Sequence, residues 1–360
     1  MSKIFFTPGP SALYFTVEQH IKNALKENIP SISHRSKEYV KMHQSTIEGI
    51  RELLSVPDNF NIGFTSSATE IWERSIENLV NENSFHFVNG SFSEKFYKVA
   101  QSLGKNASAQ IATPGSNNDI TVANIPESTE LITVAQNETS TGAAIPAESF
   151  KKLRENNPNS LISVDVVSSA PISNIDLQHV DSMYFSVQKC FGLPAGLGVW
   201  IYNEKCLNKA QQLKSQGKYH DTYNGLLNID KFAQKSQTSC TPNVMNIYLL
   251  GKVIEDMLAK GVDQMRKEAL YKSALIYNLY DTHDGLNSFV NEKKYRSITV
   301  GVGEVLNGAE SLMKQLSDKK MIVGGGYSEF KGKHIRIANF PTHSKEQMEM
   351  LVDTINALDF

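Results

Sequence analysis

The sequence has few cysteines, little net charge and no long apolar run. Its three cysteines, Cys190, Cys206 and Cys240, form no C-x-x-C pair, so they indicate neither a disulfide framework nor a zinc site. A formal net charge of −2 over 360 residues gives no reason to expect nucleic acid or a membrane as a partner. No apolar run approaches the roughly 20 residues of a membrane span, and the N-terminus lacks the apolar core of a signal peptide. We therefore expect a cytoplasmic protein without a metal.

The remaining composition, 40% hydrophobic and 21% charged, is that of a globular protein with about two domains. From about residue 36 to 203, helix-like stretches alternate with short apolar strands, expected at 61–64, 85–88, 131–135, 161–167, 183–187 and 197–202. This alternation predicts an α/β fold with a large, doubly wound, mostly parallel sheet. Beyond residue 243, two long helices and a mixture of strands and helices predict a small α+β domain. We place the large domain at 16–245 and the small domain at 246–360 with 1–15.

A lysine follows one of the expected strands. Lys189 comes directly after the apolar run 183–187 and before the turn formers Gly192, Pro194 and Gly196. A lysine at the end of a buried strand is costly unless it is deprotonated or hydrogen-bonded. One chemistry that uses such a lysine is Schiff-base formation with pyridoxal phosphate (PLP). The commoner explanation for an isolated lysine is a solvated surface charge.

An aspartate ends another expected strand. Asp165 lies within the apolar run 161–167, before Lys189 in sequence. PLP enzymes place a carboxylate against the pyridine nitrogen, because a protonated ring is the better electron sink. An aspartate also commonly caps the turn after a strand. The pair Asp165 and Lys189, at the carboxyl ends of strands in one parallel sheet, favours the PLP interpretation.

Small and hydroxyl-bearing residues follow three further strands. Residues 65–69, Thr-Ser-Ser-Ala-Thr, join a strand to a helix, where backbone N–H groups and the helix dipole could hold a phosphate. Such junctions are also rich in Ser and Thr simply as helix caps. Phe92 could stack on a flat heterocycle, although one loop aromatic more often serves packing. Residues 137–142, Asn-Glu-Thr-Ser-Thr-Gly, add hydroxyls at the same sheet edge.

The order of these segments resembles that of the class V aminotransferases, which are PLP enzymes of fold type I. The resemblance runs from residue 4 to about 355 and rests on segments at 7–10, 33–36, 137–142, 164–169 and 188–196. Within the class, the chain most resembles the phosphoserine aminotransferases, through segments at 32–38, 241–242, 261–265, 295–297 and 323–325. The set of segments is specific, whereas no single segment is.

The resemblance implies roles in cofactor binding. Lys189 would form the Schiff base with PLP, and Asp165 would face the pyridinium nitrogen. Phe92 would replace the family's usual ring-stacking tryptophan, and Thr139 would bond the pyridine hydroxyl. The cofactor phosphate would be held by Ala68, Thr69 and Gln188 of one subunit and by Cys240 and Thr241 of the other. A homodimer with its active sites at the interface follows from that shared phosphate site.

The resemblance also implies how small amino acids and 2-oxo acids bind. Arg336, on an expected strand, would clamp the substrate α-carboxylate as a bidentate fork, although an exposed strand charge is the commoner explanation. His34 and Arg35 would meet a substrate anion, unless they only form an exposed turn. The phosphoserine aminotransferases carry a His-Arg pair before the Val-Gly-Gly segment. Here Lys320 and Met321 take those places, and Lys320 could supply a point charge.

These residues predict a PLP-dependent aminotransferase of serine biosynthesis that uses phosphoserine and 2-oxoglutarate. Several segments also resemble serine– or alanine–glyoxylate aminotransferases, so an enzyme that uses glyoxylate or pyruvate is the alternative. A cysteine desulfurase shares the fold, but none of the cysteines lies in the loop 324–332 where that chemistry needs one. A non-catalytic binding module would leave Lys189 and Asp165 without a function.

Overall fold

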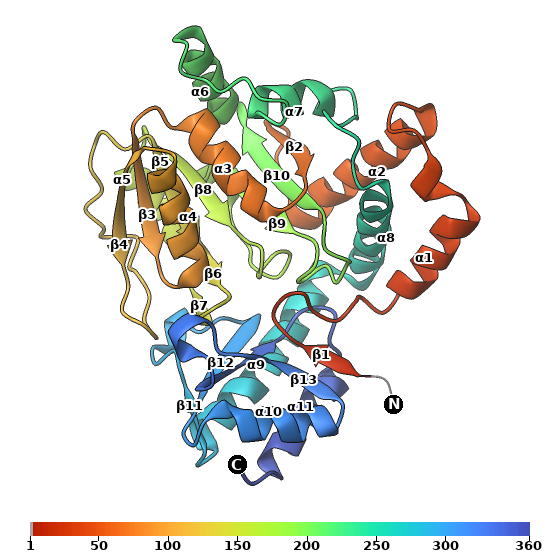
Figure 1. The fold of residues 1–360 in the computed structure, drawn as a ribbon, viewed down its shortest axis with the longest axis vertical. Helices are drawn as coiled ribbons and strands as arrows, with labels where there is room; N and C mark the ends of the chain where they lie inside the picture. Colours follow the sequence, from red (N-terminus) through yellow and green to blue (C-terminus); the bar gives the residue numbers. More distant parts are fainter. Residues whose placement is uncertain (1–2) are drawn as a thin grey trace.

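The computed structural model describes residues 3–360. It contains two large sheets, with the larger in the upper part of Figure 1 and the smaller in the lower part, and a two-stranded hairpin. The C-terminus lies beside the smaller sheet (Figure 1). None of the helices in the described part of the chain is long and apolar enough to cross a membrane.

The larger sheet has seven strands and is mostly parallel. Its order is β2 (Phe60–Thr65), β10 (Gly198–Asn203), β9 (Ser182–Ser186), β8 (Leu161–Asp165), β5 (Leu131–Ala135), β3 (Asn83–Val88) and β4 (Asn106–Ile111). Only β10 runs antiparallel to its neighbours; the pairs from β9 to β4 are parallel. The predicted α/β fold with a mostly parallel sheet is confirmed, and β4, which has little apolar character, is a strand that the sequence pattern did not predict.

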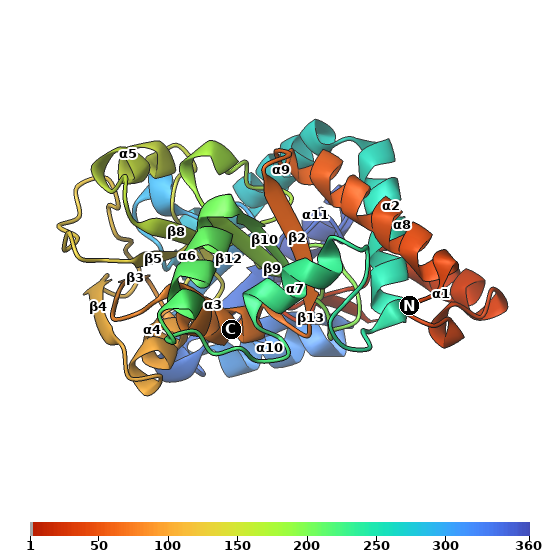
Figure 2. The same ribbon diagram turned by 90° about the horizontal axis from the view of Figure 1, so that it is seen from above.

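Helices cover both faces of the larger sheet (Figure 2). One face packs against α3 (Ala68–Leu79), α4 (Ser91–Ser102) and α6 (Glu204–Ser215), beside α7 (Leu226–Ala233). The other face packs against α2 (Lys37–Leu54), α5 (Ser149–Asn156) and α8 (Val244–Lys260), and α1 (Val17–Lys26) packs against α8. Strand β10 shows why both faces are covered, since its side chains alternate: Val199 and Ile201 enter one core, and Trp200 and Tyr202 enter the other. The alternating apolar side chains therefore need cover on both sides.

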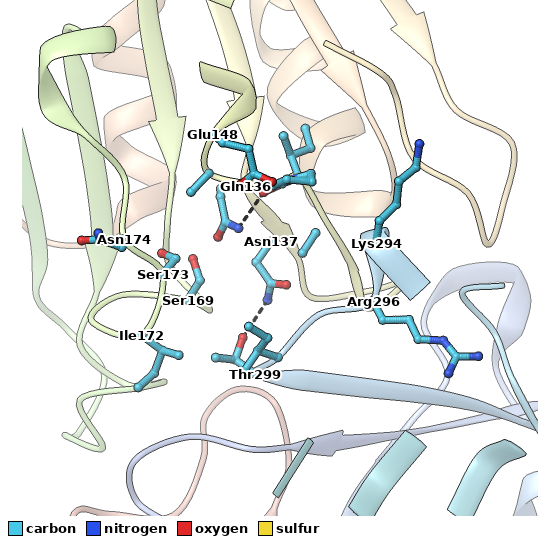
Figure 3. A pocket seen from close by; sticks show the side chains of 15 residues that line it. Gln136, Asn137, Glu148, Ser169, Ile172, Ser173, Asn174, Lys294, Arg296 and Thr299 are labelled. Carbon is cyan, nitrogen blue, oxygen red and sulfur yellow. Dashed lines mark hydrogen bonds between the residues drawn. The ribbon is translucent and has the colours of Figure 1, made fainter. Parts of the chain in front are cut away.

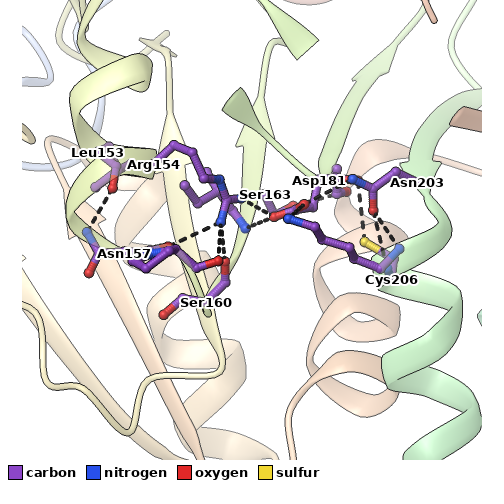
Figure 4. Close-up of polar contacts among 12 residues, drawn as sticks. Leu153, Arg154, Asn157, Ser160, Ser163, Asp181, Asn203 and Cys206 are labelled. Atoms are coloured by element: carbon purple, nitrogen blue, oxygen red, sulfur yellow. Dashed lines mark hydrogen bonds and ion pairs between the residues drawn. The ribbon is translucent and has the colours of Figure 1, made fainter. Parts of the chain in front are cut away.

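A buried ion pair ties together the amino ends of the central strands (Figure 4). Asp181, just before β9, pairs with Arg154 of α5 and accepts a hydrogen bond from the backbone N–H of Ile162 in β8 at 2.9 Å. The side chain of Asn203, at the end of β10, also donates to Asp181 at 2.9 Å. Because the carboxylate is buried, these donors are what make its charge tolerable. The opposite edge of the sheet, at the carboxyl ends of these strands, is left for the site.

The smaller sheet has five strands, in the order β1 (Ile4–Phe6), β13 (Met321–Gly325), β14 (His334–Ala338), β12 (Val300–Val305) and β11 (Leu286–Ser288). Strand β1 is parallel to β13, and the other pairs are antiparallel. Three helices accompany it: α9 (Val262–Thr282), α10 (Ala309–Asp318) and α11 (Lys345–Asn356). A short hairpin of β6 (Asn137–Glu138) and β7 (Ala143–Ala144) lies between the sheets. The domain boundary at residue 245 stays a proposal, since α8 packs in the core of the larger sheet.

Candidate active site

Lys189 lies three residues beyond the end of β9, in the turn that leads to β10. Its side chain is only 8% exposed, and its Nζ donates to Thr139 Oγ1 at 2.8 Å. The Nζ also lies 5.0 Å from the centre of the Phe92 ring. Burial lowers the pKa of this lysine, and the nearby Asp165 carboxylate partly opposes that effect. A buried lysine with a lowered pKa can act as a nucleophile or base near neutral pH.

Asp165 is the last residue of β8 and pairs across the sheet with Tyr184 of β9. Its carboxyl is buried and accepts one hydrogen bond, from the backbone N–H of Val167 at 2.8 Å. Burial raises the pKa of Asp165 to about 6, although the Val167 hydrogen bond and Lys189 favour its charged form. A buried carboxyl with so little compensation is suited to receive a cationic partner.

The N-terminal segment covers Lys189. Gly9 has φ +146°, and a Cβ atom there would lie 2.8 Å from Cε of Lys189. Only glycine fits this approach, which explains the Thr-Pro-Gly-Pro segment at 7–10. The backbone N–H of Ser11 donates to the carbonyl of Gln188 at 3.1 Å. The chain therefore links the smaller sheet, through β1, directly to the lysine turn.

Phe92 is held beside Lys189 by a carboxylate that sequence reasoning did not single out. Glu138 is fully buried and accepts from the backbone N–H groups of Phe92 at 3.3 Å and Ser93 at 2.9 Å. It also accepts from the hydroxyl of Ser140 at 2.7 Å. A Cβ at Gly90 would lie 2.5 Å from Glu138 Cγ, so glycine is required there. The Asn-Glu-Thr segment that pointed to Thr139 contained this residue, but only the fold reveals its contact with the start of α4.

The junction between β2 and α3 has the expected helix start. Ser67 caps α3 by accepting from the N–H of Glu70 at 3.2 Å, and Thr69 lies in the first turn. The N–H of Ala68 donates to Ser186 Oγ at 2.7 Å, which joins this helix to the end of β9. A cavity of about 240 Å³ beside it is lined by residues that include Thr65, Ser66, Cys240 and Thr241. The helix start and residues 240–241 therefore share one concave surface.

Arg336 reaches the same region from β14 of the smaller sheet. Its Nε donates to the Gly325 carbonyl at 2.7 Å and its Nη1 to the Thr139 carbonyl at 3.3 Å. Thr139 is thus bonded to Arg336 through its backbone and to Lys189 through its hydroxyl. The guanidinium is half-buried, and its carbon lies 5.4 Å from the centre of the Tyr327 ring. This places a fixed cation next to the lysine.

A second cation beside Arg336 was not predicted from the sequence. Lys95, on α4, donates from Nζ to the Tyr327 hydroxyl at 2.7 Å and lies 5.3 Å from the Phe92 ring centre. Tyr327 follows β13, so this contact joins the two sheets across the site. The sequence carried no signal for it, because one lysine on the polar face of a helix looks like any other.

The remaining cations that the sequence predicted lie elsewhere on this chain. His34 and Arg35 form a turn before α2, where Arg35 donates to the Gln237 side chain at 2.7 Å and stacks on Phe232 at 4.7 Å. This turn therefore packs against the segment that leads to Cys240. Lys320 directly precedes β13, whereas Arg336 pairs with Gly324 near the end of that strand. Four residues of strand separate the two positions by about 13 Å.

The geometry can now be set beside known proteins. The family model Aminotransferase class-V matches residues 5–328. A phosphoserine aminotransferase of Rhodococcus opacus is 28% identical over 336 residues, which cover 90% of this chain and 87% of that protein. The crystal structure of a phosphoserine aminotransferase from Cytophaga hutchinsonii superposes with a TM-score of 0.96 at 44% identity and covers 98% of both chains. An alanine–glyoxylate aminotransferase from Nostoc sp., at 21% identity and a TM-score of 0.83 over 99% of this chain and 95% of that one, shares the fold.

The chain belongs to the class V aminotransferases. It is a transaminase, and its fold is that of the fold-type I PLP enzymes. Its cofactor is PLP, as in this family. The residues around Lys189 fit that cofactor, because they combine a buried lysine, an aromatic ring beside it and a buried carboxyl whose nearby cation is Lys189. The prediction of a PLP aminotransferase is confirmed, whereas the individual residue roles are still proposals.

Proposed function

We propose that this enzyme transfers the amino group of phosphoserine to 2-oxoglutarate, giving a phosphorylated 2-oxo acid and glutamate. The similarity to the Cytophaga hutchinsonii protein, 44% identical over 98% of the chain, is the observation that carries the proposal. Relatives called phosphoserine aminotransferases cover about nine-tenths of the chain. We further propose that the enzyme works in the cytoplasm.

Lys189 holds PLP and moves the proton. When it is bound, PLP supplies an electron sink for the negative charge that develops at the substrate Cα. Burial lowers the pKa of Lys189, so its neutral amine is more available to accept the Cα proton and return it to the cofactor side. Thr139 Oγ1, 2.8 Å from Nζ, keeps that amine in place.

Asp165 and Phe92 hold the cofactor ring in two different ways. Asp165 ionises readily above pH 6 and offers its charge to the ring nitrogen, where a cationic partner would lower the pKa of the carboxyl again. Phe92 lies on one side of Lys189 and packs against the ring plane. Ala68, Thr69 in the first turn of α3 and the nearby Gln188 would hold the cofactor phosphate at the start of this helix.

Arg336 binds the α-carboxylate of the amino acid. Its Nε and Nη1 bond to Gly325 and Thr139, and this fixes the guanidinium toward the site. A planar fork of donors suits a carboxylate. A substrate clamped there has its Cα close to Lys189, because Thr139 contacts both cations.

The substrate phosphate carries a charge of about −1.5 to −2 at neutral pH and needs further cations. We assign the binding of this phosphate to Lys95, which lies beside Arg336, together with His34 and Arg35 from a second subunit. Lys320 directly precedes β13, whereas Arg336 pairs with Gly324 near the end of that strand, and we assign the phosphate contact to Lys95 in its place. We further propose a homodimer in which His34, Arg35, Cys240 and Thr241 reach the site of the partner subunit; Arg35 packs against the segment that leads to Cys240.

The second candidate is a serine or alanine aminotransferase that uses glyoxylate or pyruvate. Lys320 and Met321, at the places of the His-Arg pair of phosphoserine aminotransferases, favour it. Single-turnover spectra of the PLP-loaded enzyme with phosphoserine, serine, alanine and glutamate distinguish the two. We expect the fastest reaction with phosphoserine and glutamate. A faster reaction with serine or alanine would contradict the phosphoserine assignment.

A further inference from the structure

A cavity of about 270 Å³ lies behind the site, at the junction of the two sheets (Figure 3). Its wall is formed by the segments 136–137 and 144–148, in and around the β6–β7 hairpin, by 169–174 after β8, and by 294–299 before β12. None of the residues assigned above to PLP or substrate lines this cavity. It is therefore separate from the site around Lys189.

Four polar atoms in its wall are buried without a hydrogen-bond partner: Gln136 Oε1, Asn137 Oδ1, Ser169 Oγ and Ser173 Oγ. Gln136, Asn137 and Ser169 are 7%, 4% and 3% exposed, so open solvent does not satisfy them. An unpaired buried polar atom is unfavourable, and native proteins rarely leave several together. Figure 3 shows Gln136, Asn137, Ser169 and Ser173 together in the wall of the cavity. Their grouping indicates a polar occupant.

The hydrogen bonds of the amide nitrogens fix which atoms are free. Gln136 Nε2 donates to the Ile145 carbonyl at 2.9 Å, and Asn137 Nδ2 donates to Ser168 Oγ at 2.8 Å. Their oxygens are therefore the unpaired atoms of these two lining residues, and an amide oxygen can only accept. The occupant must bring hydrogen-bond donors, while the two serine hydroxyls can either donate or accept.

The two cations in the cavity wall are each paired with an acid. Arg296 extends away from the cavity and pairs through both Nη atoms with Asp281, at 2.7 and 2.8 Å (Figure 3). Lys294 is exposed and pairs with Glu292 at 3.5 Å. The carboxylate of Glu148 also lines the cavity, and Ile145 and Ile172 are among its apolar residues. The shape and chemistry suit an –NH₂ or –NH₃⁺ group on a short aliphatic body.

We propose that this cavity is a second binding site, for a small amine or carboxamide, and that its occupant acts on Lys189. A chain of hydrogen bonds connects the two places: Asn137 donates to Ser168 at 2.8 Å, Thr139 donates to Ser168 at 2.9 Å, and Lys189 donates to Thr139 at 2.8 Å. In the cofactor-free protein a ligand on Asn137 Oδ1 therefore changes the polarity of a chain that ends on Lys189, and in the PLP-loaded enzyme the chain ends on Thr139 beside that lysine. This inference rests on the aminotransferase activity, not on the choice of phosphoserine.

The probe is butyramide, whose –NH₂ can donate to Gln136 and Asn137 and whose carbonyl can accept from the serines. Butyrate, similar in size, offers only acceptors and is the control. Calorimetry on the PLP-loaded enzyme should give saturable binding of butyramide, at least tenfold tighter than butyrate, without competition from the amino-acid substrate. Saturating butyramide should change kcat/KM for the best substrate at least twofold at pH 7.

Ser173→Leu, which fills the cavity from its rim, should weaken butyramide binding at least tenfold and leave transamination without butyramide unchanged. Ser128→Leu, an exposed position outside the cavity, is the matched control and should keep wild-type binding. The site would be overturned by equal binding of butyramide and butyrate, or by unchanged binding of butyramide to Ser173→Leu. It would also be overturned if a crystal soaked with butyramide held only ordered water in the cavity. Binding without any change in kcat/KM would overturn its action on Lys189.

Discussion

Replacing Asp165 by Asn should stabilise the cofactor-free protein and cripple the enzyme. The pKa of this buried carboxyl is raised from 3.8 to about 6, a difference of about 2.2 units. At 1.36 kcal/mol per unit, the charged form costs the cofactor-free protein about 3 kcal/mol at pH 8. The stability that a carboxyl with a raised pKa contributes to the folded protein is fully present below pH 3.8 and is lost as the pH rises through about 6. An asparagine has no charge to bury, so it removes this loss.

Urea unfolding of the cofactor-free proteins at pH 5 and pH 8 measures the effect. Linkage with these two pKa values gives a fall of about 1.4 kcal/mol in the unfolding free energy of the wild type between pH 5 and 8, which Asp165→Asn should lack. Asp119→Asn is the control, because hydrogen bonds to Thr121 lower the pKa of that exposed acid and its contribution is constant above pH 5. Equal pH dependence in wild type and Asp165→Asn would refute the reasoning.

With PLP bound, the order of stability of the wild type and Asp165→Asn should be reversed. A ring cation beside Asp165 would make its charge favourable, so the PLP-loaded wild type should be the more stable protein above pH 6. Turnover by Asp165→Asn should fall by orders of magnitude while PLP still binds, because the ring nitrogen loses its anionic partner. If kcat stays at the wild-type value, Asp165 only caps the turn after β8.

Three further substitutions test the site. Lys189→Ala should abolish transamination and bind PLP without a covalent bond; measurable turnover would remove the lysine from the mechanism. Arg35→Ala should raise KM for phosphoserine at least tenfold, about 1.4 kcal/mol, and leave alanine nearly unaffected, which steady-state kinetics on both substrates will show. Lys95→Gln should also raise KM for phosphoserine severalfold and spare alanine, and an equal loss on both substrates would mean that Lys95 only holds Tyr327 in place.

The sequence was sufficient where function depends on the end of an apolar strand. Lys189 and Asp165 could be found because β9 and β8 are short buried runs, and whatever follows them lies at the carboxyl edge of a parallel sheet. Arg336 and Phe92 were added to the predicted site by the resemblance to the class V aminotransferases. The helix start at 67–69 followed from cap residues, and the structure has the cap at Ser67.

Contacts between distant segments could not be predicted. Glu138 meets the start of α4, and Lys95 meets Tyr327, only because the chain folds them together over 45 and 232 positions. Strand β4 was missed because its residues, Asn106–Ile111, lie at the sheet edge and need few apolar side chains.

Borohydride reduction of the PLP-loaded enzyme, followed by peptide mapping, tests most directly the claim that Lys189 carries the cofactor. Reduction fixes PLP on the lysine to which it is bound. Lys272 is the natural competitor, because it is also buried and its pKa is lowered to about 8. Its Nζ, however, donates to the carbonyls of Phe340 and His343, at 3.2 and 2.7 Å. We predict label on Lys189 alone, and label on Lys272 or any other lysine would contradict the account.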